Sequence, residues 1–521
     1  MARRHLPALL LAGLIAPGAT GATTLTAERA LGDDLTVALD AERAEVVLLE
    51  RREDGIRALR PLPPRDRPAD GLCAIRRGGL LDLFVGDGEG HWEQWSLQQG
   101  DAAWSAHEVR TVHTGPDSEL CAISADGHWL FLSEENVGIW ALGAGAEAPA
   151  SRVLLEHLPD FEPEALVAGA NGLHWTAADG TLHAVELTRL PPPPHAWPVV
   201  RPRHESATVA RFGDAADDPA IYSAKGVHLV LATDKQGALM LLDAEGELIE
   251  RIETGRLNNV DLRRETGGTA IVAATDRTHG TLAVFRLDPE GPRLIRLQGE
   301  TPLDLADPYG LCLYRDPAGT LGAFANDTDG RVVHVALAVA GDRVRLEPRA
   351  AWQMGSQTEG CVVDDDRGLL WLGEEARGVW RFPLDATSAS VGELVIDAAA
   401  TPLVPDVEGL ARLRDAAGRE LLLVSSQGDD SYALFDVDRA EAHWLGSFRI
   451  GADLDAGLDG ASETDGLELH PSDLGGRYPG GVLVVQDGRN RMPDAPQNFK
   501  FVALEDVLHA LDQSRNASSS R

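Results

Sequence analysis

The chain repeats itself, and this repetition limits the folds that it can adopt. The segment 70–97 ("DGLCAIRRGGLLDLFVGDGEGHWEQWSL") resembles 309–337, and the segment 118–140 ("SELCAISADGHWLFLSEENVGIW") resembles 358–380 ("TEGCVVDDDRGLLWLGEEARGVW"). The two pairs occur in the same order at nearly the same offset. One ancestral domain therefore occurs twice.

The two copies are separated by "LPPPPHAWP", which is typical of a stiff polyproline spacer. We therefore expect an export signal, a first copy, a linker, a second copy and a disordered tail at residues 1–22, 23–190, 191–198, 199–512 and 513–521.

The N-terminus has the pattern of an export signal. Arg3 and Arg4 precede the apolar run "LPALLLAGLIA", and small residues in "GATGA" offer a cleavage site. The run is short for a membrane span, and its flanks disfavour the alternative of a buried first helix. The sequence predicts a periplasmic or secreted protein that does not stay in the membrane after signal removal.

Short hydrophobic runs such as "HLVLATD", "TAIVAATD" and "GGVLVVQD", separated by DG and GG turns, predict an all-β protein. Equivalent turns recur roughly every fifty residues, the size of a four-stranded propeller blade. The second copy has room for a six-bladed β-propeller, and the first for about three or four blades, an incomplete and degenerate propeller-like domain. An array of β-sandwiches is the competing fold.

The formal net charge of −35 argues against nucleic acid or an anionic membrane as a partner, because both bind basic surfaces. An incomplete propeller leaves open sheet edges. We therefore expect the first domain to dock on the second, within a monomer.

The four cysteines occupy equivalent places in the repeat, Cys73 matching Cys312 and Cys121 matching Cys361. Each could be a small buried strand residue. An even count in an exported chain favours the disulfides Cys73–Cys121 and Cys312–Cys361, each between neighbouring blades.

Acidic clusters recur at strand ends of the second copy, for example "GDAADDPA", "SQTEG", "PDVEG" and "LDGASETDG". A single cluster is usually a solvated turn, but several in one propeller suit a hard cation of the calcium type. The EF-hand spacing and the HExxH motif of zinc enzymes are absent.

Three residues near these clusters, Lys235, Arg277 and Tyr309, suit an anionic ligand with several phosphates. Each of them alone would more often have a surface or structural role.

The second copy resembles the β-propeller phytases in the segments "GDAADDPAIY", "TGRLNNVDLR", "YGLCLY", "GSQTEGCVVDD", "GEEARGVWRF", "PDVEGL", "SSQGDDSYALF", "SETDG", "VVQDGRN" and "QNFKFV". These segments run in order from about residue 205 to 502, nearly the whole domain. The resemblance implies a six-bladed propeller with several Ca²⁺ ions. It also implies a 3-phytase-type phosphoric monoester hydrolase that acts on phytate or calcium-phytate by attack of an activated water.

The resemblance also implies roles for individual residues. The catalytic calcium cluster would comprise Glu359, Glu374, Glu408, Asp459 and Asp465. Substrate phosphates would contact Lys235, Arg277 and Tyr309. Further calcium ligands, of a structural kind, would be Glu205, Asp218, Asn259, Asp261, Asp487 and Asn490. The chain departs from the family pattern at Gln236 and Thr328, where a lysine can occur.

The first copy keeps Glu119 and the pair Glu134–Glu135, but Asp70 stands in the place of Tyr309. We expect it to be inactive. Two other functions fit the same residues: a non-catalytic, calcium-stabilised propeller that binds anionic ligands, and another propeller hydrolase such as a lactonase.

Overall fold

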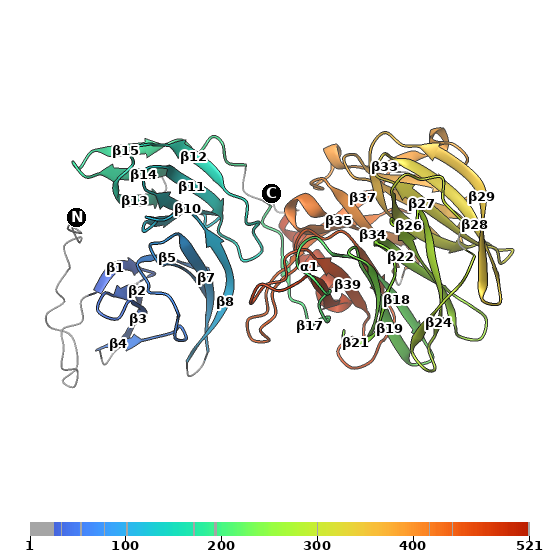
Figure 1. The fold of residues 1–521 in the computed structure, drawn as a ribbon, viewed down its shortest axis with the longest axis horizontal. Coiled ribbons are helices and arrows are strands. Elements are labelled where there is room, and N and C mark those ends of the chain that lie inside the picture. Colours follow the sequence, from blue (N-terminus) through green and yellow to red (C-terminus); the bar gives the residue numbers. More distant parts are fainter. Residues whose placement is uncertain are drawn as a thin grey trace. The chain divides into compact units, whose positions relative to one another are not determined.

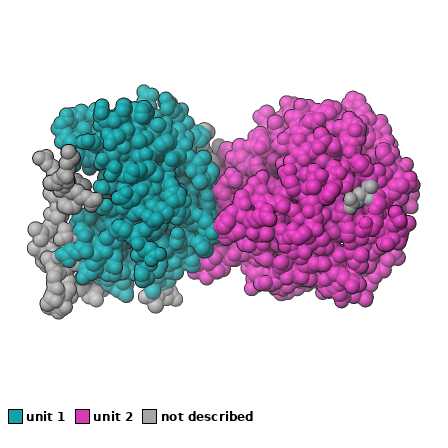
Figure 2. Space-filling model, viewed as in Figure 1, with its two compact units in different colours: residues 1–193, 491–494 teal, residues 194–490, 495–521 magenta. Residues whose placement is uncertain are grey.

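The computed structural model describes residues 25–32, 34–52, 55–77, 79–100, 103–169, 172–191, 195–299, 301–415, 417–439 and 441–518. The predicted export signal, residues 1–22, lies outside this set. The chain divides into two compact units (Figures 1 and 2). Unit 1 comprises residues 1–193 with 491–494, and unit 2 comprises residues 194–490 with 495–521. The division falls inside the proline-rich segment 191–198.

The described part of unit 2 contains six sheets, and each is a blade built mainly from four consecutive antiparallel strands. The first blade has β18 (Ala216–Ala224), β19 (Val227–Asp234), β20 (Ala238–Asp243) and β21 (Leu248–Glu253). The second has β22 (Leu257–Arg264), β23 (Ala270–Asp276), β24 (Thr281–Asp288) and β25 (Arg293–Arg296). The third has β26 (Pro308–Arg315), β27 (Leu321–Asp327), β28 (Arg331–Ala340) and β29 (Arg343–Gln353).

The fourth blade has β30 (Thr358–Asp364), β31 (Leu369–Glu374), β32 (Gly378–Pro383) and β33 (Glu393–Asp397). The fifth has β34 (Val407–Arg414), β35 (Glu420–Ser426), β36 (Ser431–Asp436) and β37 (His443–Ile450), with β16 (Val199–Val200) added in parallel. The sixth has β38 (Leu467–His470), β39 (Val482–Asp487), β40 (Asn498–Ala503) and β17 (His204–Glu205).

The first strands of the six blades form a closed ring. The contacts run from β18 to β22, β26, β30, β34 and β38, and from β38 back to β18. The strand β17, from the start of unit 2, completes the last blade by pairing with β40, so the ring is closed by both ends of the unit. The predicted six-bladed propeller is confirmed.

The second strand of a blade is buried on both faces because a neighbouring blade covers each side of its sheet. All seven residues of β23, "AIVAATD", are buried, as are all seven of β27. The outer strand β21, "LIERIE", is partly exposed along its whole length. Continuous apolar runs, rather than strict alternation, thus mark the inner strands.

One α-helix occurs in the described residues, α1 (Leu504–Ser518), with 3₁₀ helices at Ala389–Val391, Ala398–Ala400 and Gln427–Asp429. Val507 and Leu511 of α1 are buried. The helix continues past residue 513, where we expected a disordered tail to begin. Nothing in "DQSRNAS" breaks a helix, since the segment lacks glycine and proline.

The described part of unit 1 contains four sheets. They are β1–β4 (Leu25–Ala30, Leu35–Asp40, Glu45–Arg52, Gly55–Leu59), β5–β8 (Gly71–Arg77, Leu80–Gly86, His91–Gln99, Trp104–His113), β9–β12 (Cys121–Ile123, Trp129–Glu134, Gly138–Gly143, Val153–His157) and β13–β15 (Pro163–Gly169, Gly172–Ala177, Leu182–Val185). Neighbouring sheets again contact through their first strands, β1 with β5, β5 with β9 and β9 with β13. The described part of unit 1 thus has four blade-like sheets, fewer than the six of unit 2.

Both predicted disulfides are present. Cys73–Cys121 joins β5 to β9, and Cys312–Cys361 joins β26 to β30. Each therefore ties together the first strands of adjacent blades. The part of the chain that the structure describes contains no helix long and apolar enough to cross a membrane.

Candidate active site

A bulge at the start of the first strand positions the functional side chains of unit 2. In five blades the pairing between the first and second strands slips across two residues. These pairs are Asp217–Asp218, Asn258–Asn259, Tyr309–Gly310, Glu359–Gly360 and Glu408–Gly409. A bulge leaves residues out of the ladder and redirects their side chains, so polar groups of several blades can face one place.

Glycine follows the functional residue where two of these strands approach closely. A Cβ atom on Gly310 would lie 2.0 Å from the Glu359 carbonyl oxygen, and one on Gly360 would lie 2.2 Å from that of Glu408. Gly409 is crowded in the same way by Asp465. Only glycine allows this spacing, and the repeated acid–glycine pairs of the sequence are its signature.

Glu359, Glu375 and Glu408 form a buried group of carboxylates. Each offers an oxygen, and these oxygens all lie within 4.8 Å of one another. Glu359 is 1% exposed, and its Oε1 accepts a hydrogen bond from Asn258 Nδ2 at 2.8 Å. We call these three residues the carboxylate triad.

Lys235 pairs with a second set of acids, of which Asp217 is fully buried. Its ammonium lies 2.6 Å from Asp465 Oδ2, 3.3 Å from Asp217 Oδ1 and 2.6 Å from Asp214 Oδ1. Burial lowers the pKa of Lys235, but these three carboxylates raise it by more than burial lowers it, so the net shift of the pKa is upward. Lys235 stays charged at neutral pH.

Arg277 and Tyr309 lie together. The guanidinium of Arg277 stands over the Tyr309 ring, 5.1 Å from its centroid, as in a cation–π contact. Burial raises the pKa of Tyr309, and the charge of Glu359 raises it further, so its hydroxyl stays protonated and can donate a hydrogen bond.

Burial is the main cause of raised pKa values among the acids. It raises the pKa of Asp217 to about 7 and that of Glu375 to about 7. It also raises the pKa of Glu359 and Glu408 well above the usual range, and repulsion by Asp217 and Glu359, respectively, adds to the effect. Buried acids repel one another, so without a cation this group of acids favours protonation.

The donor set fits a hard cation. Three buried oxygens, Asp217 Oδ2, Glu375 Oε1 and Glu408 Oε2, have no hydrogen-bond partner among the described residues. Unsatisfied buried carboxylate oxygens are costly, and a calcium-type ion satisfies such groups.

Glu374 lies differently from the prediction. Its carboxylate accepts hydrogen bonds from Trp380 Nε1 at 2.7 Å and Ser356 Oγ at 2.8 Å. Its neighbour Glu375, which the sequence analysis did not select, belongs to the carboxylate triad. Successive residues point to different sides of the chain, so only one of the pair can face the triad.

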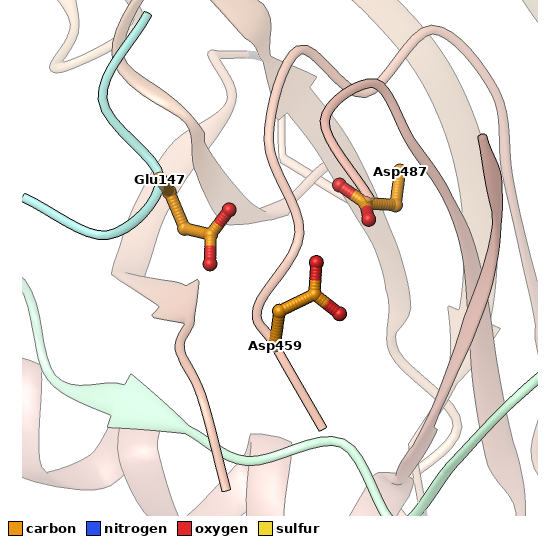
Figure 3. Close-up of side chains that lie close together, drawn as sticks. All are labelled: Glu147, Asp459 and Asp487. Carbon is orange, nitrogen blue, oxygen red and sulfur yellow. The ribbon is translucent and has the colours of Figure 1, made fainter. Parts of the chain in front are cut away.

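Asp459 also differs from the predicted catalytic cluster. It forms an ion pair with the fully buried Lys500, which lies 2.6 Å from Glu205 Oε2 and 3.3 Å from Asp487 Oδ2. Oxygens of Asp459 and Asp487 lie within 4.8 Å of one another (Figure 3). Lys500 Nζ also donates to Asn490 Oδ1 at 3.4 Å. Asp459, on the loop between β37 and β38, therefore lies close to three of the predicted structural ligands.

The other predicted structural ligands, Asp218, Asn259 and Asp261, line a cavity of about 480 Å³ between the first strands. Asp218 Oδ2 accepts the N–H of Val260 at 2.9 Å, and Asp261 pairs with Arg263 at 2.9 Å. The six predicted structural ligands thus divide between two places. Asp218, Asn259 and Asp261 come from the inner strands β18 and β22, whereas the other three come from β17, the end of β39 and the loop after it.

These features define a closed six-bladed propeller with a buried group of acids that could bind a cation, beside Lys235, Arg277 and Tyr309. Residues 195–519 match the family model described as Phytase, and the chain belongs to that family. A similar protein is the 3-phytase of Bacillus subtilis (strain 168), 32% identical over 334 residues, which covers 59% of this chain and 84% of the relative. A chain in the crystal structure of a nidogen/laminin complex is 14% identical with a TM-score of 0.32, and the match covers 51% of this chain and 84% of that one.

Proposed function

We propose that the protein is a calcium-dependent phosphomonoesterase that releases phosphate from phytate, a reaction of the 3-phytase type. The observation that carries the proposal is the carboxylate triad with its unpartnered oxygens, next to Lys235, Arg277 and Tyr309. Membership of the phytase family supports it.

In this proposal Lys235 and Arg277 bind phosphoryl oxygens, and the Tyr309 hydroxyl donates a hydrogen bond to a third. These groups hold the phosphorus in line with the attacking water and stabilise the charge that develops on its oxygens. Calcium, when bound by the acids, would neutralise phosphoryl charge and lower the pKa of a coordinated water.

The reaction breaks one ester bond. The water oxygen forms a bond to phosphorus, and the bond from phosphorus to the inositol oxygen breaks. The attacking water loses one proton, and the departing oxygen takes up one proton from solvent, so the step is balanced. Glu375 is 8% exposed, and an oxygen of its carboxylate that is not bound to a cation can accept the proton of the water. No group of the enzyme becomes phosphorylated.

The placement of the other predicted residues refines the metal assignment. We assign Glu359, Glu375 and Glu408, with Asp217 and Asp465, to the catalytic cations. We assign Asp459 to a second site with Glu205, Asp487 and Asn490, where the ammonium of Lys500 neutralises part of the negative charge. The role of Asp218, Asn259 and Asp261 as calcium ligands stays a prediction.

The two disulfides are typical of proteins that fold in an oxidising compartment. Together with the pattern of residues 1–22 they support export to the periplasm or the medium. The monomeric state, the docking of the first domain and its inactivity stay predictions.

The test is phosphate release from phytate, with calcium and with a chelator in excess. We expect release with calcium and a loss of about 100-fold or more with the chelator. Binding of phytate without release would instead indicate a non-catalytic propeller. Hydrolysis of a lactone but not of phytate would indicate a different propeller hydrolase.

A further inference from the structure

Lys235 is already paired with an acid that is open to solvent. Two of its three carboxylate partners, Asp217 and Asp465, belong to the inner part of the site, with side chains 0% and 13% exposed. The third, Asp214, has a side chain that is 77% exposed and comes from the loop before β18. Asp214 is therefore the partner of Lys235 that solvent and ligands can reach most easily.

Arg277 shows the same arrangement. Its Nε donates to Asp307 Oδ1 at 2.8 Å, and its Nη2 donates to Asp307 Oδ2. The carboxylate thus engages the guanidinium with both oxygens, the geometry in which arginine also binds phosphate. The Asp307 side chain is 36% exposed, whereas that of Arg277 is 16% exposed.

The backbone next to each of these two aspartates is fixed by hydrogen bonds to buried side chains. Ala215 N and Ala216 N, which follow Asp214, donate to Gln497 Oε1 at 2.7 and 2.8 Å. Ala306 N and Asp307 N donate to the buried Asp327 Oδ2 at 2.6 and 3.1 Å. Because both loops are held by buried side chains, the two aspartates have fixed positions next to Lys235 and Arg277.

We propose that Asp214 and Asp307 occupy the positions that substrate phosphate groups take when they bind. Each aspartate pairs with the cation that a phosphate group must contact, keeps that cation in position, and competes with the phosphate for it. This inference rests on the proposed function of Lys235 and Arg277. It makes the two aspartates specificity-determining residues, because an anionic group enters only by displacing a carboxylate of similar shape and charge.

The test is equilibrium binding of myo-inositol hexakissulfate, which carries six anionic groups and no phosphate ester. Calorimetry on the full calcium-loaded chain compares the wild type with Asp214→Asn and Asp307→Asn. The amide keeps the shape and removes the competing charge. We expect each variant to bind about threefold to fivefold more tightly, the upper part of the range for the loss of one partly exposed ion pair.

Asp304→Asn is the matched control. Asp304 is in the same loop as Asp307, its side chain is 84% exposed, and it pairs with Arg331 outside the site. The change in net charge is identical, and we expect binding to change by less than about twofold. Asp307→Glu, which keeps the charge, should bind about as the wild type does. Melting temperatures establish that each variant is folded.

Weaker binding by Asp307→Asn would overturn the proposal, because it would show that the aspartate only supports Arg277. Unchanged binding, or equal tightening in Asp304→Asn, would overturn it as well. A wild type that binds no hexakissulfate and releases no phosphate from phytate would contradict the proposed function itself.

Discussion

Glu119 and Glu359 stand at the same place in the two copies of the repeat, but their surroundings differ. Glu359 is 1% exposed in the closed ring of unit 2, whereas Glu119 is exposed in unit 1. The same holds for the next acid, since Glu375 is buried and its counterpart Glu135 is exposed. Closure of the ring converts exposed strand-end acids into a crowded, buried group whose repulsion a bound cation would relieve.

Other features are unchanged between the copies. Trp140 Nε1 donates to Glu134 Oε2 at 2.7 Å, just as Trp380 Nε1 donates to Glu374 Oε2 at 2.7 Å. Because this bond persists in the unit whose acids are exposed, it belongs to the architecture of the blade. The hydrogen bond from Trp380 to Glu374 is therefore structural, and Glu374 does not belong to the carboxylate triad.

Removal of calcium should have the largest effect, and it should act on unit 2. We expect the melting temperature to fall by about 10 °C or more, the range for the loss of several tightly bound ions. Amide exchange should increase in β30 and β34 and change little in β5 and β9. Equal increases in both units, measured by mass spectrometry, would show that calcium does not stabilise unit 2 selectively.

The two disulfides offer a matched pair of variants, because their sequence separations are 48 and 49 residues. Loss of either, by paired Cys→Ser changes, should destabilise its own unit by about 3 kcal/mol. Only loss of Cys312–Cys361 should also reduce phosphate release, by about tenfold, because Cys361 follows Glu359 by two residues and the spacing of β26 and β30 would relax. Similar activity losses from the two pairs would argue against this.

The smallest effect expected is a pH dependence of the metal-free protein. Burial raises the folded-state pKa of Asp217 and of Glu375 to about 7. A raised carboxyl pKa contributes stability that is present at low pH and lost as pH rises through the folded pKa. Unit 2 without calcium should therefore melt at a lower temperature at about pH 8 than at about pH 6. His334 does not contribute to this difference, because burial lowers its pKa to about 4, below both pH values.

Calcium should reverse this trend, because its ligands must be ionised. Thermal scans at the two pH values, with and without chelator, measure both slopes. The exposed strand-end acids of unit 1 lose less hydration, so the protection of its amides, relative to their intrinsic exchange rate at each pH, should vary less with pH. A metal-free unit 2 that becomes more stable toward pH 8 would show that these acids are not buried without a cation.

The repeat made the fold predictable. Turn signals recurring at the length of a blade gave the six blades, and equivalent cysteines in adjacent blades gave the disulfides. The closing strands were not predictable in detail. The segment of β17, His204–Glu205, is only two residues long, and its partner β40 lies at the far end of the unit, so no local pattern marks the pairing.

The site was predictable to the level of a segment, but the individual residue depended on register. In "GEE" the sequence does not tell which glutamate turns toward the triad, and the hydrogen bond from Trp380 to Glu374 decides it. In "DGASETDG" Asp459 and Asp465 are six residues apart on one loop, and that loop carries them to different partners, Lys500 and Lys235. Ion pairs between distant loops left no pattern in the sequence.

In our interpretation, the closed ring of unit 2 creates the site from acids that the repeat also places in unit 1. Phosphate release from phytate by full-length Glu359→Gln and Glu119→Gln, in the presence of calcium, tests it most directly. Glu359→Gln should lower release by about 100-fold or more, because it removes a buried ligand charge while keeping the shape. Glu119→Gln should stay within about twofold of the wild type. Equal losses in the two variants would contradict the claim.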